Sequence, residues 1–251
     1  MSDSYEGVAE FYDLFAKNDD LEFFVKLALE CGGRALELGV GTARVAIELA
    51  RSGISVTGID TSRDMLDVAR RKMKREPEEV KQRLTLKRAD MRSFHLGQVF
   101  DLVYSPGGGF QECLTAKDMN DCLNCVFSHL KREGKLVLAI WMPSLERDFG
   151  ERVYDEPRRY HHDNMVARSI VWSEPGKEGR PRIKILYQVF AGGLLLREHE
   201  VTATVNVLSA EKVRSVLEGS GFSIEQELGN FESGQYVPGD EWMVVVAKQR
   251  V

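Results

Sequence analysis

The fold of this chain is decided by the stretch Ala35-Leu36-Glu37-Leu38-Gly39-Val40-Gly41-Thr42-Ala43-Arg44. Its first residues form a short apolar run typical of a buried strand, and a glycine turn leads from that run directly into residues with helical spacing. An acid, Asp60, follows about twenty residues later, at the end of the next apolar run. This arrangement predicts a nucleoside-binding site in an open α/β sheet, where ligands lie beyond the carboxyl ends of the strands.

Apolar runs and helical patterns alternate along the chain on either side of this turn. We expect strands at 34–38, 54–59, 84–87, 100–104 and 135–141, and helices at 42–52, 62–75 and 118–130. Strands that alternate with helices of this length predict βαβ units and a mostly parallel sheet. We also expect a helix at 210–219, followed by strands at 222–228 and 242–248 that complete the sheet. Because no helix separates the last two strands, we expect them to pair as an antiparallel hairpin.

Two regions depart from this alternation. The first thirty residues carry aromatic side chains at helical spacing and are expected to form two helices. Residues 148–208 contain extended segments near 165–172, 182–189 and 194–207, separated by glycine-containing turns. We therefore expect an N-terminal helical lid at 1–31, a core domain made of 32–147 and 209–251, and an antiparallel β insertion or substrate cap at 148–208.

The composition narrows the possible partners and location. The chain has 251 residues, a formal net charge of −5, 43% hydrophobic and 29% charged residues, which allows a full core. An acidic balance argues against nucleic acid as the main partner. No stretch resembles a signal peptide or a membrane span, so we expect a cytoplasmic protein without membrane contact. Cys122 and Cys125 fall within an expected helix with no second pair at zinc-site spacing, and no metal site is predicted.

The residue after the glycine turn discriminates between cofactors. A dinucleotide fingerprint needs a small residue at its third conserved position, so that the helix can pack closely on the strand. Counted from Gly39 and Gly41, that position is occupied by Arg44. An arginine is difficult to reconcile with such close packing, and NAD is therefore disfavoured.

At this point the chain resembles the class I S-adenosylmethionine-dependent methyltransferases, over about residues 33–145 and the terminal hairpin. The similar motifs, in order along the chain, are Glu37–Ala43, Gly58–Ser62, Ala89–Met91, Phe100–Ser105 and the turn-like Lys131–Leu136. The resemblance implies a doubly wound, mostly parallel, seven-stranded Rossmann-like sheet and S-adenosyl-L-methionine as cofactor. It implies cofactor contacts from Tyr12, Glu37, Gly39, Gly41, Asp60, Thr61, Met65, Asp90, Met91 and Ser105. Among these, Asp60 would bind the ribose hydroxyls, Met65 would pack against adenine, and Asp90 would lie near the adenine amino group.

The resemblance also suggests where the methyl acceptor binds. Tyr5 and Tyr12 look like the lid of small-molecule methyltransferases, and the insertion looks like that of enzymes that dimethylate amino sugars. His161 and His162 are candidate general bases, because histidine accepts a proton near neutral pH, and Tyr12 is a third candidate catalytic residue. We expect methyl transfer to a nitrogen or oxygen of a small molecule by in-line displacement. A non-catalytic cofactor- or partner-binding domain, or an enzyme acting on tRNA or protein, stays open, as do the oligomeric state and the role of the insertion.

Overall fold

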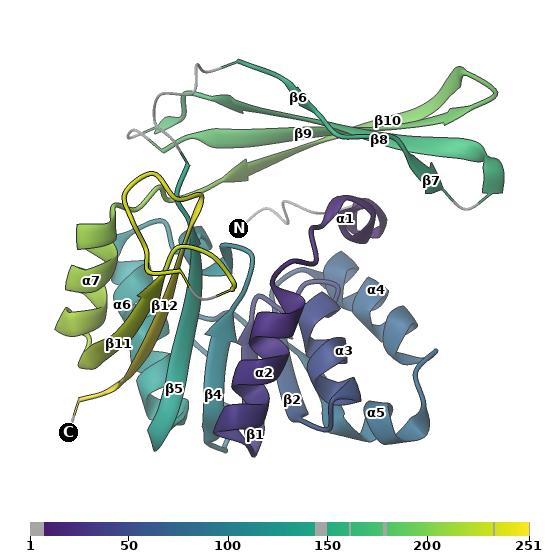
Figure 1. Cartoon of the computed structure of the whole chain (residues 1–251). Coiled ribbons are helices and arrows are strands. Elements are labelled where there is room, and N and C mark those ends of the chain that lie inside the picture. Colours follow the sequence, from purple (N-terminus) through teal and green to yellow (C-terminus); the bar gives the residue numbers. More distant parts are fainter. Residues whose placement is uncertain (1–7, 144–149, 161, 178–179, 233, 251) are drawn as a thin grey trace.

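The computed structural model describes residues 8–143, 150–160, 162–177, 180–232 and 234–250. Two sheets form the molecule, with the insertion lying across one end of a larger α/β core (Figure 1). The N-terminal helix α1 (Ala9–Phe15) lies between them. The first of the two helices expected in the first thirty residues lies partly outside the described residues, and so does the expected lid residue Tyr5.

The core sheet has the order β11-β12-β5-β4-β1-β2-β3. Its strands are β1 (Arg34–Leu38), β2 (Ser55–Asp60), β3 (Leu84–Arg88), β4 (Phe100–Ser105), β5 (Leu130–Trp141), β11 (Phe222–Leu228) and β12 (Trp242–Gln249). The pairs β1–β2, β1–β4, β2–β3 and β4–β5 are parallel, whereas β12 is antiparallel to both β5 and β11. The expected seven-stranded sheet with an antiparallel terminal hairpin is therefore confirmed.

Helices cover both faces of this sheet. One apolar cluster joins the sheet to α6 (Ala116–His129) and α7 (Ala210–Gly219). The other joins it to α2 (Leu21–Cys31), α3 (Arg44–Arg51), α4 (Arg63–Met73) and α5 (Glu78–Arg83). The strand order changes direction at β1, between β2 and β4, so the crevice typical of doubly wound folds opens at the carboxyl ends of these strands.

The insertion forms a second, antiparallel sheet. Its order is β10-β9-β8-β6, with β7 paired to β8. The strands are β6 (Val153–Tyr154), β7 (Arg158–Tyr160), β8 (His162–Glu174), β9 (Arg182–Ala191) and β10 (Leu194–Thr204). The expected antiparallel character is confirmed, and the division into separate domains stays a prediction.

Several short elements differ from the expectations. Helix α5, strands β6 and β7 and the 3-10 turn η1 (Gly109–Glu112) are too short to show a clear hydrophobic period, and the sequence did not predict them. The turn expected at 131–136 is wrong, because β5 begins directly after α6. The register between β4 and β5 shifts there, from Phe100 opposite Leu130 to Leu102 opposite Lys135, so the intervening residues form an irregular part of the strand.

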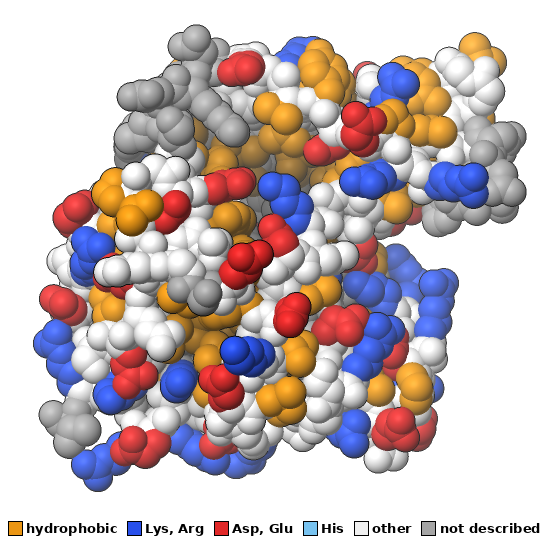
Figure 2. Space-filling model, in the orientation of Figure 1, with side chains coloured by type: hydrophobic (Ala, Val, Ile, Leu, Met, Phe, Trp, Pro, Cys, Tyr) orange, Lys and Arg blue, Asp and Glu red, His pale blue; other side chains and the backbone are white. Residues whose placement is uncertain are grey.

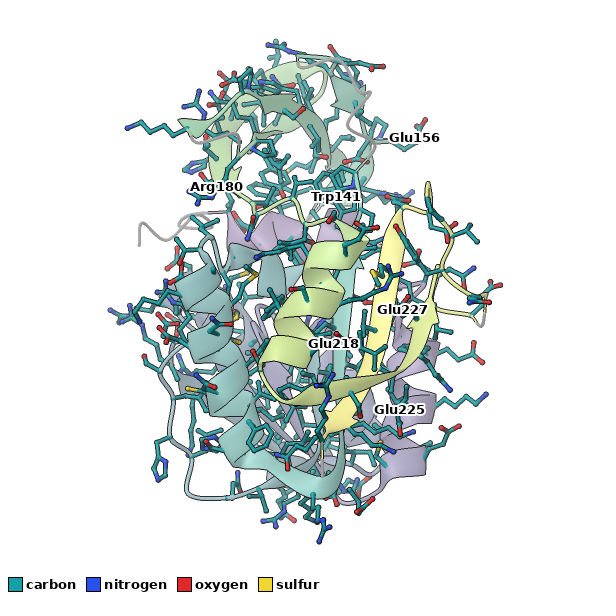
Figure 3. The ribbon with its side chains drawn as sticks, turned by 90° about the vertical axis from the view of Figure 1, so that its left-hand side faces the viewer. Trp141, Glu156, Arg180, Glu218, Glu225 and Glu227 are labelled. Atoms are coloured by element: carbon teal, nitrogen blue, oxygen red, sulfur yellow. The ribbon has the colours of Figure 1, made fainter. Side chains whose placement is uncertain are left out.

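A buried glutamine ties the two sheets together where the chain passes between them. Gln111 Nε2 donates to the carbonyl oxygens of Trp141 and Asn206, both at 3.0 Å, and Gln111 Oε1 accepts from Trp141 N at 2.8 Å. Trp141 ends β5, just before the insertion, as Figure 3 shows at the junction of the two parts. Asn206 lies where the chain returns. The clamp therefore fixes the outgoing and returning segments side by side.

No helix among the described residues is long and apolar enough to span a membrane.

Candidate cofactor and acceptor sites

A cavity of about 960 Å³, part of which is open to solvent, lies at the carboxyl ends of β1, β2 and β4. Its lining comprises Tyr12, Gly39, Gly41, Ile59, Asp60, Thr61, Ser62, Met65, Ala89, Asp90, Met91, Arg92, Pro106, Gly107, Gly109, Glu112 and Cys113. Eight of the ten expected cofactor residues are in this lining, and Glu37 and Ser105 are not. We name this cavity the cofactor pocket.

The glycine turn brings backbone close to the cofactor pocket. Gly39 and Gly41 have φ of 69° and 52°, in the left-handed region that glycine adopts readily. Apart from glycines, Ala43 is the only residue in the described part of the chain with a positive φ, which is 60°. The side chain of Val40 folds over β2, where a Cβ on Gly58 would lie 2.5 Å from Val40 Cγ2. The second motif therefore begins with a glycine, Gly58, because the Val40 side chain of the first turn packs directly against it.

Asp60 closes this turn from the end of β2. Its Oδ2 accepts a hydrogen bond from Gly41 N at 2.7 Å, and its Oδ1 accepts from Ser62 N at 2.8 Å. A carboxylate oxygen can accept more than one hydrogen bond, so the same group can also receive hydroxyl donors from the pocket. The acid thus holds the turn in shape and presents negative charge to a ligand.

Asp90 is held by a neighbour that the sequence did not single out. Arg92 donates from Nε to Asp90 Oδ1 at 2.9 Å and from Nη2 to Oδ2 at 2.6 Å, and its Nη1 reaches Asp118 at 3.0 Å. These hydrogen bonds lower the pKa of Asp90, which stays ionised. Spacing gave no signal for Arg92, because a residue two positions after the motif acid is often on the surface.

Glu37 and Ser105 support the cofactor pocket from beneath. Glu37 is only 2% exposed, and Tyr104 Oη donates to its Oε2 at 2.7 Å. Burial raises the pKa of Glu37 to about 8, although the Tyr104 hydrogen bond acts in the opposite direction. Ser105 is fully buried and donates to Leu38 O at 3.2 Å. Direct cofactor contact by these two residues stays a prediction.

Arg44 is not among the described residues that line the cofactor pocket, and its side chain is held in an ion pair. It makes a two-pronged ion pair with Asp20, with distances of 2.5 and 2.7 Å, and the two side chains are 15% and 4% exposed. The pair joins the beginning of α3 to the beginning of α2. An arginine at this position therefore organises the N-terminal helices, which explains its place directly after the glycine turn.

A second cavity, of about 920 Å³, adjoins the first. Its lining comprises Tyr12, Phe15, Ala16, Lys17, Asp19, Asp20, Arg44, Gly107, Asp155, Ser169, Val171, Ile185, Tyr187, Phe231, Glu241 and Trp242. Tyr12 and Gly107 line both cavities. We name this cavity the acceptor pocket. It lies between the core and the insertion, which overhangs the core and leaves an open notch at the right of Figure 2.

Helix α1 is anchored to both parts of the molecule and so positions Tyr12. On the core side, Asp13 accepts from Thr42 Oγ1 at 2.6 Å and pairs with Lys72 Nζ at 2.7 Å. On the insertion side, the Phe11 ring stacks on Tyr160 and Tyr187, with centroids 5.3 and 5.1 Å apart. Burial raises the pKa of Tyr12, which keeps its hydroxyl protonated.

The side chains of the two histidine candidates lie outside what the structure describes. His161 lies outside the described residues. His162 begins β8, seven residues before Ser169 of the acceptor pocket, and a strand of that length extends about 23 Å. A role for either histidine as general base stays a prediction without support from this geometry.

The residues of the cofactor pocket fit S-adenosylmethionine. Asp60 and Asp90 present acceptors for hydroxyl and amino groups, and Ile59, Met65 and Met91 present apolar surface for a planar base. The cofactor carries no phosphate, so the turn does not need the phosphate cradle of a dinucleotide site. The resemblance and the pocket chemistry therefore agree.

Comparison with known proteins supports the same assignment. Residues 35–134 match the model of a family described as a methyltransferase domain. The putative methyltransferase YqeM of Bacillus subtilis is 33% identical over 141 residues, which span 54% of this chain and 55% of that relative. The dTDP-3-amino-3,6-dideoxy-alpha-D-glucopyranose N,N-dimethyltransferase of Streptomyces fradiae is 25% identical over 88% of this chain and 86% of its own length.

A solved structure extends the likeness to the whole fold. The CcbJ methyltransferase from Streptomyces caelestis superimposes with a TM-score of 0.80 at 19% identity, over 99% of this chain and 98% of that one. The superposition covers the insertion as well as the core, so the two-sheet arrangement is shared. With the motifs in order and the matching family model, residues 35–134 form a methyltransferase domain of the class I S-adenosylmethionine-dependent type, and the whole chain shares the fold of solved methyltransferases.

Proposed function

We propose that this protein transfers a methyl group from S-adenosylmethionine to a nitrogen or oxygen of a small molecule held in the acceptor pocket. The observation that carries the proposal is that Tyr12 and Gly107 line both pockets. Two ligands bound side by side would meet at these residues. The relative from Streptomyces fradiae is named as an N,N-dimethyltransferase of an amino sugar, which supports a small acceptor and favours nitrogen.

The chain's own residues contribute position and exclusion of water. S-Adenosylmethionine supplies an electrophilic methyl group on a sulfonium when it is bound. Asp60 and Asp90 would hold the nucleoside part, and the glycine turn lets backbone approach it closely. Tyr12 closes the junction between the pockets from α1. Alignment of two reactants in a closed site contributes several kcal/mol to methyl transfer, about 7–11 kcal/mol in the most favourable intramolecular reactions.

The proposal is tested by incubating the protein with methyl-labelled S-adenosylmethionine and a panel of small amines and hydroxyl compounds. We expect label in at least one small molecule and release of S-adenosylhomocysteine. Cofactor binding without transfer to any member would favour a non-catalytic domain. Transfer to tRNA or to a protein, with none to small molecules, would contradict the proposed acceptor class.

A further inference from the structure

The inner face of the insertion sheet contributes a cluster of polar groups to the acceptor pocket. Ser169 of β8 and Tyr187 of β9 lie directly opposite each other in the antiparallel register, so their side chains share one face. Asp155 follows β6; its N–H donates to Ser169 O at 3.1 Å, and its Oδ2 accepts from the Ser169 hydroxyl. All three residues line the acceptor pocket. Backbone pairing and the serine thus fix the position of the Asp155 carboxylate.

Tyr187 presents an unused hydroxyl to this pocket. The residue is only 5% exposed, yet within the described part of the chain its hydroxyl makes no hydrogen bond. Its ring is fixed by Phe11 at 5.1 Å and by Phe15 at 5.8 Å, both from the N-terminal segment. No buried side-chain oxygen or nitrogen of the described residues lacks a hydrogen-bond partner, so a Tyr187 hydroxyl without one is accessible from the cavity that the residue lines. A rigidly held hydroxyl that faces a cavity is therefore placed for a ligand.

The charge of the acceptor pocket favours a cationic ligand. Of its four carboxylates, Asp20 is neutralised by Arg44, and Glu241 lies 3.9 Å from Lys17. Asp19 and Asp155 have no ion pair with any of the residues that the structure describes. Aromatic rings in the wall, such as that of Trp242, also attract cations. An alcohol or an anion would gain nothing from this charge.

We propose that Asp155 and Tyr187 form the polar contact site of the acceptor pocket and bind the nitrogen of a small cationic amine, which is the methyl acceptor. The inference rests on the proposed function and specifies its substrate class and its contact residues. Burial, together with the nearby Tyr12 and Asp155, raises the pKa of Tyr187, so its hydroxyl stays neutral. Tyr187 therefore serves as a hydrogen-bonding group, and Asp155 supplies the charge.

With Asp155 and Tyr187 in these roles, every proton, bond and charge of the methyl transfer is accounted for. The bound ammonium first loses one proton to solvent through the open side of the pocket, which frees the nitrogen lone pair. The nitrogen then forms a bond to the methyl carbon while the methyl–sulfur bond breaks and its electron pair stays on sulfur. Positive charge moves to the nitrogen, where the Asp155 carboxylate stabilises it. The methylated ammonium leaves with its charge, so no separate strong base is required.

The experiment uses cyclohexylamine and cyclohexanol as probes, which match in size and differ in charge. Binding of each to the full chain saturated with S-adenosylhomocysteine is measured by ligand-observed saturation-transfer NMR. We expect the amine to bind about tenfold to a hundredfold more tightly, as hydrogen bonds to charged groups allow. Asp155→Asn should abolish this preference, and Tyr187→Phe should reduce it.

Glu156→Gln is the matched control. Glu156 is an exposed acid next to Asp155 that does not line the acceptor pocket, and Figure 3 shows it extending outward from the insertion. The Glu156→Gln substitution should leave the ratio of the affinities for cyclohexylamine and cyclohexanol unchanged. Damage to the fold would weaken both probes together, whereas loss of the carboxylate weakens only the amine.

The outcomes separate this inference from the proposed function. Equal binding of the two probes by the wild-type protein, or an unchanged preference in Asp155→Asn, would overturn the amine site. The proposed function would still stand if S-adenosylhomocysteine binds and label is transferred to another acceptor. Failure of S-adenosylhomocysteine to bind any variant or the wild type would instead overturn both.

Discussion

The two pockets of this enzyme are built in opposite ways. The cofactor pocket collects residues that directly follow neighbouring parallel strands, and hydrogen bonds from backbone N–H groups to a side chain, such as Gly41 N to Asp60 Oδ2, hold it. The acceptor pocket collects side chains from α1, from β8 and β9 and from the terminal hairpin, which lie far apart in the sequence. The first pocket is specified by local sequence and the second only by the assembled fold.

This difference also separates what must stay constant from what can vary. A cofactor pocket made of glycine turns and strand ends tolerates little change, because a Cβ at Gly58 already meets Val40. An acceptor pocket made of side chains on an appended sheet can change its chemistry without altering the parallel core. We therefore expect substitutions in the two pockets to affect two separate binding events.

The largest effect is expected for Asp60→Ala. The change removes the acceptor for Gly41 N and Ser62 N and the charge offered to the ribose. Two charge-assisted hydrogen bonds to a ligand are together worth about 3–6 kcal/mol, so affinity for S-adenosylhomocysteine should fall at least about a hundredfold in calorimetry. Asp67→Ala, an acid exposed on α4, is the control. Equal affinity of Asp60→Ala and the wild type would remove the distinction between the pockets.

A pH-dependent effect of similar size is expected from Glu37 beneath the cofactor pocket. Its pKa is about 8 when folded against 4.5 for the free group, so the folded state keeps a proton that the unfolded state loses between these values. The stability from the neutral carboxyl is complete below the unfolded pKa and falls by about 1.4 kcal/mol per pH unit until the folded pKa is passed.

Urea unfolding of the wild type and Glu37→Gln tests this expectation. The difference in unfolding free energy should move in favour of the variant by about 3 kcal/mol between about pH 5 and pH 7. Glu22→Gln, at an exposed position on α2, should show no such trend. A constant difference between the wild type and Glu37→Gln at every pH would mean that Glu37 is ionised in the folded protein.

A smaller effect is expected when the clamp between the two sheets is removed. Gln111→Leu leaves the backbone groups of Trp141 and the carbonyl of Asn206 without their side-chain partner. We expect a loss of about 1–3 kcal/mol of stability and faster hydrogen exchange at the ends of β5 and β12. Acceptor affinity should weaken more than cofactor affinity, because the clamp sets the insertion over the core. The opposite order would contradict the role of Gln111 as a link between the pockets.

The sequence was sufficient for the core because the relevant signals are local. The strand 34–38 and the helix 210–219 were predicted with their observed bounds, and Asp60 and Asp90 were identified from their positions at strand ends. Such residues are placed by the chain segment that contains them. Parallel strands then bring these segments to one edge of the sheet without further information.

The acceptor pocket could not be predicted from the same signals. Asp155 follows a strand too short to have a period, and Tyr187 was only one aromatic residue in an extended segment. Their meeting depends on the register between β8 and β9 and on the docking of Phe11. The adjacent histidines gave a stronger sequence signal than these residues, although His162 begins β8 far along the strand from Ser169.

The smallest effect is expected for the core-side anchor of α1. Asp13→Asn keeps a hydrogen-bond acceptor for Thr42 but removes the ion pair with Lys72. The side chains of Asp13 and Lys72 are each about one-third exposed. A pair of this kind is worth less than about 1 kcal/mol and is weakened by salt. We expect a slight, salt-dependent loss of S-adenosylhomocysteine affinity in calorimetry, since Tyr12 is next in sequence. A loss that is independent of salt would point to a steric role for the anchor.

We propose that the glycine turn and Asp60 form a site for S-adenosylmethionine and not for a dinucleotide. Calorimetric titration of the wild-type protein with S-adenosylhomocysteine and, separately, with NADH tests it most directly. We expect saturable heat with S-adenosylhomocysteine, at micromolar affinity, and none with NADH. Heat with NADH and none with S-adenosylhomocysteine would contradict it.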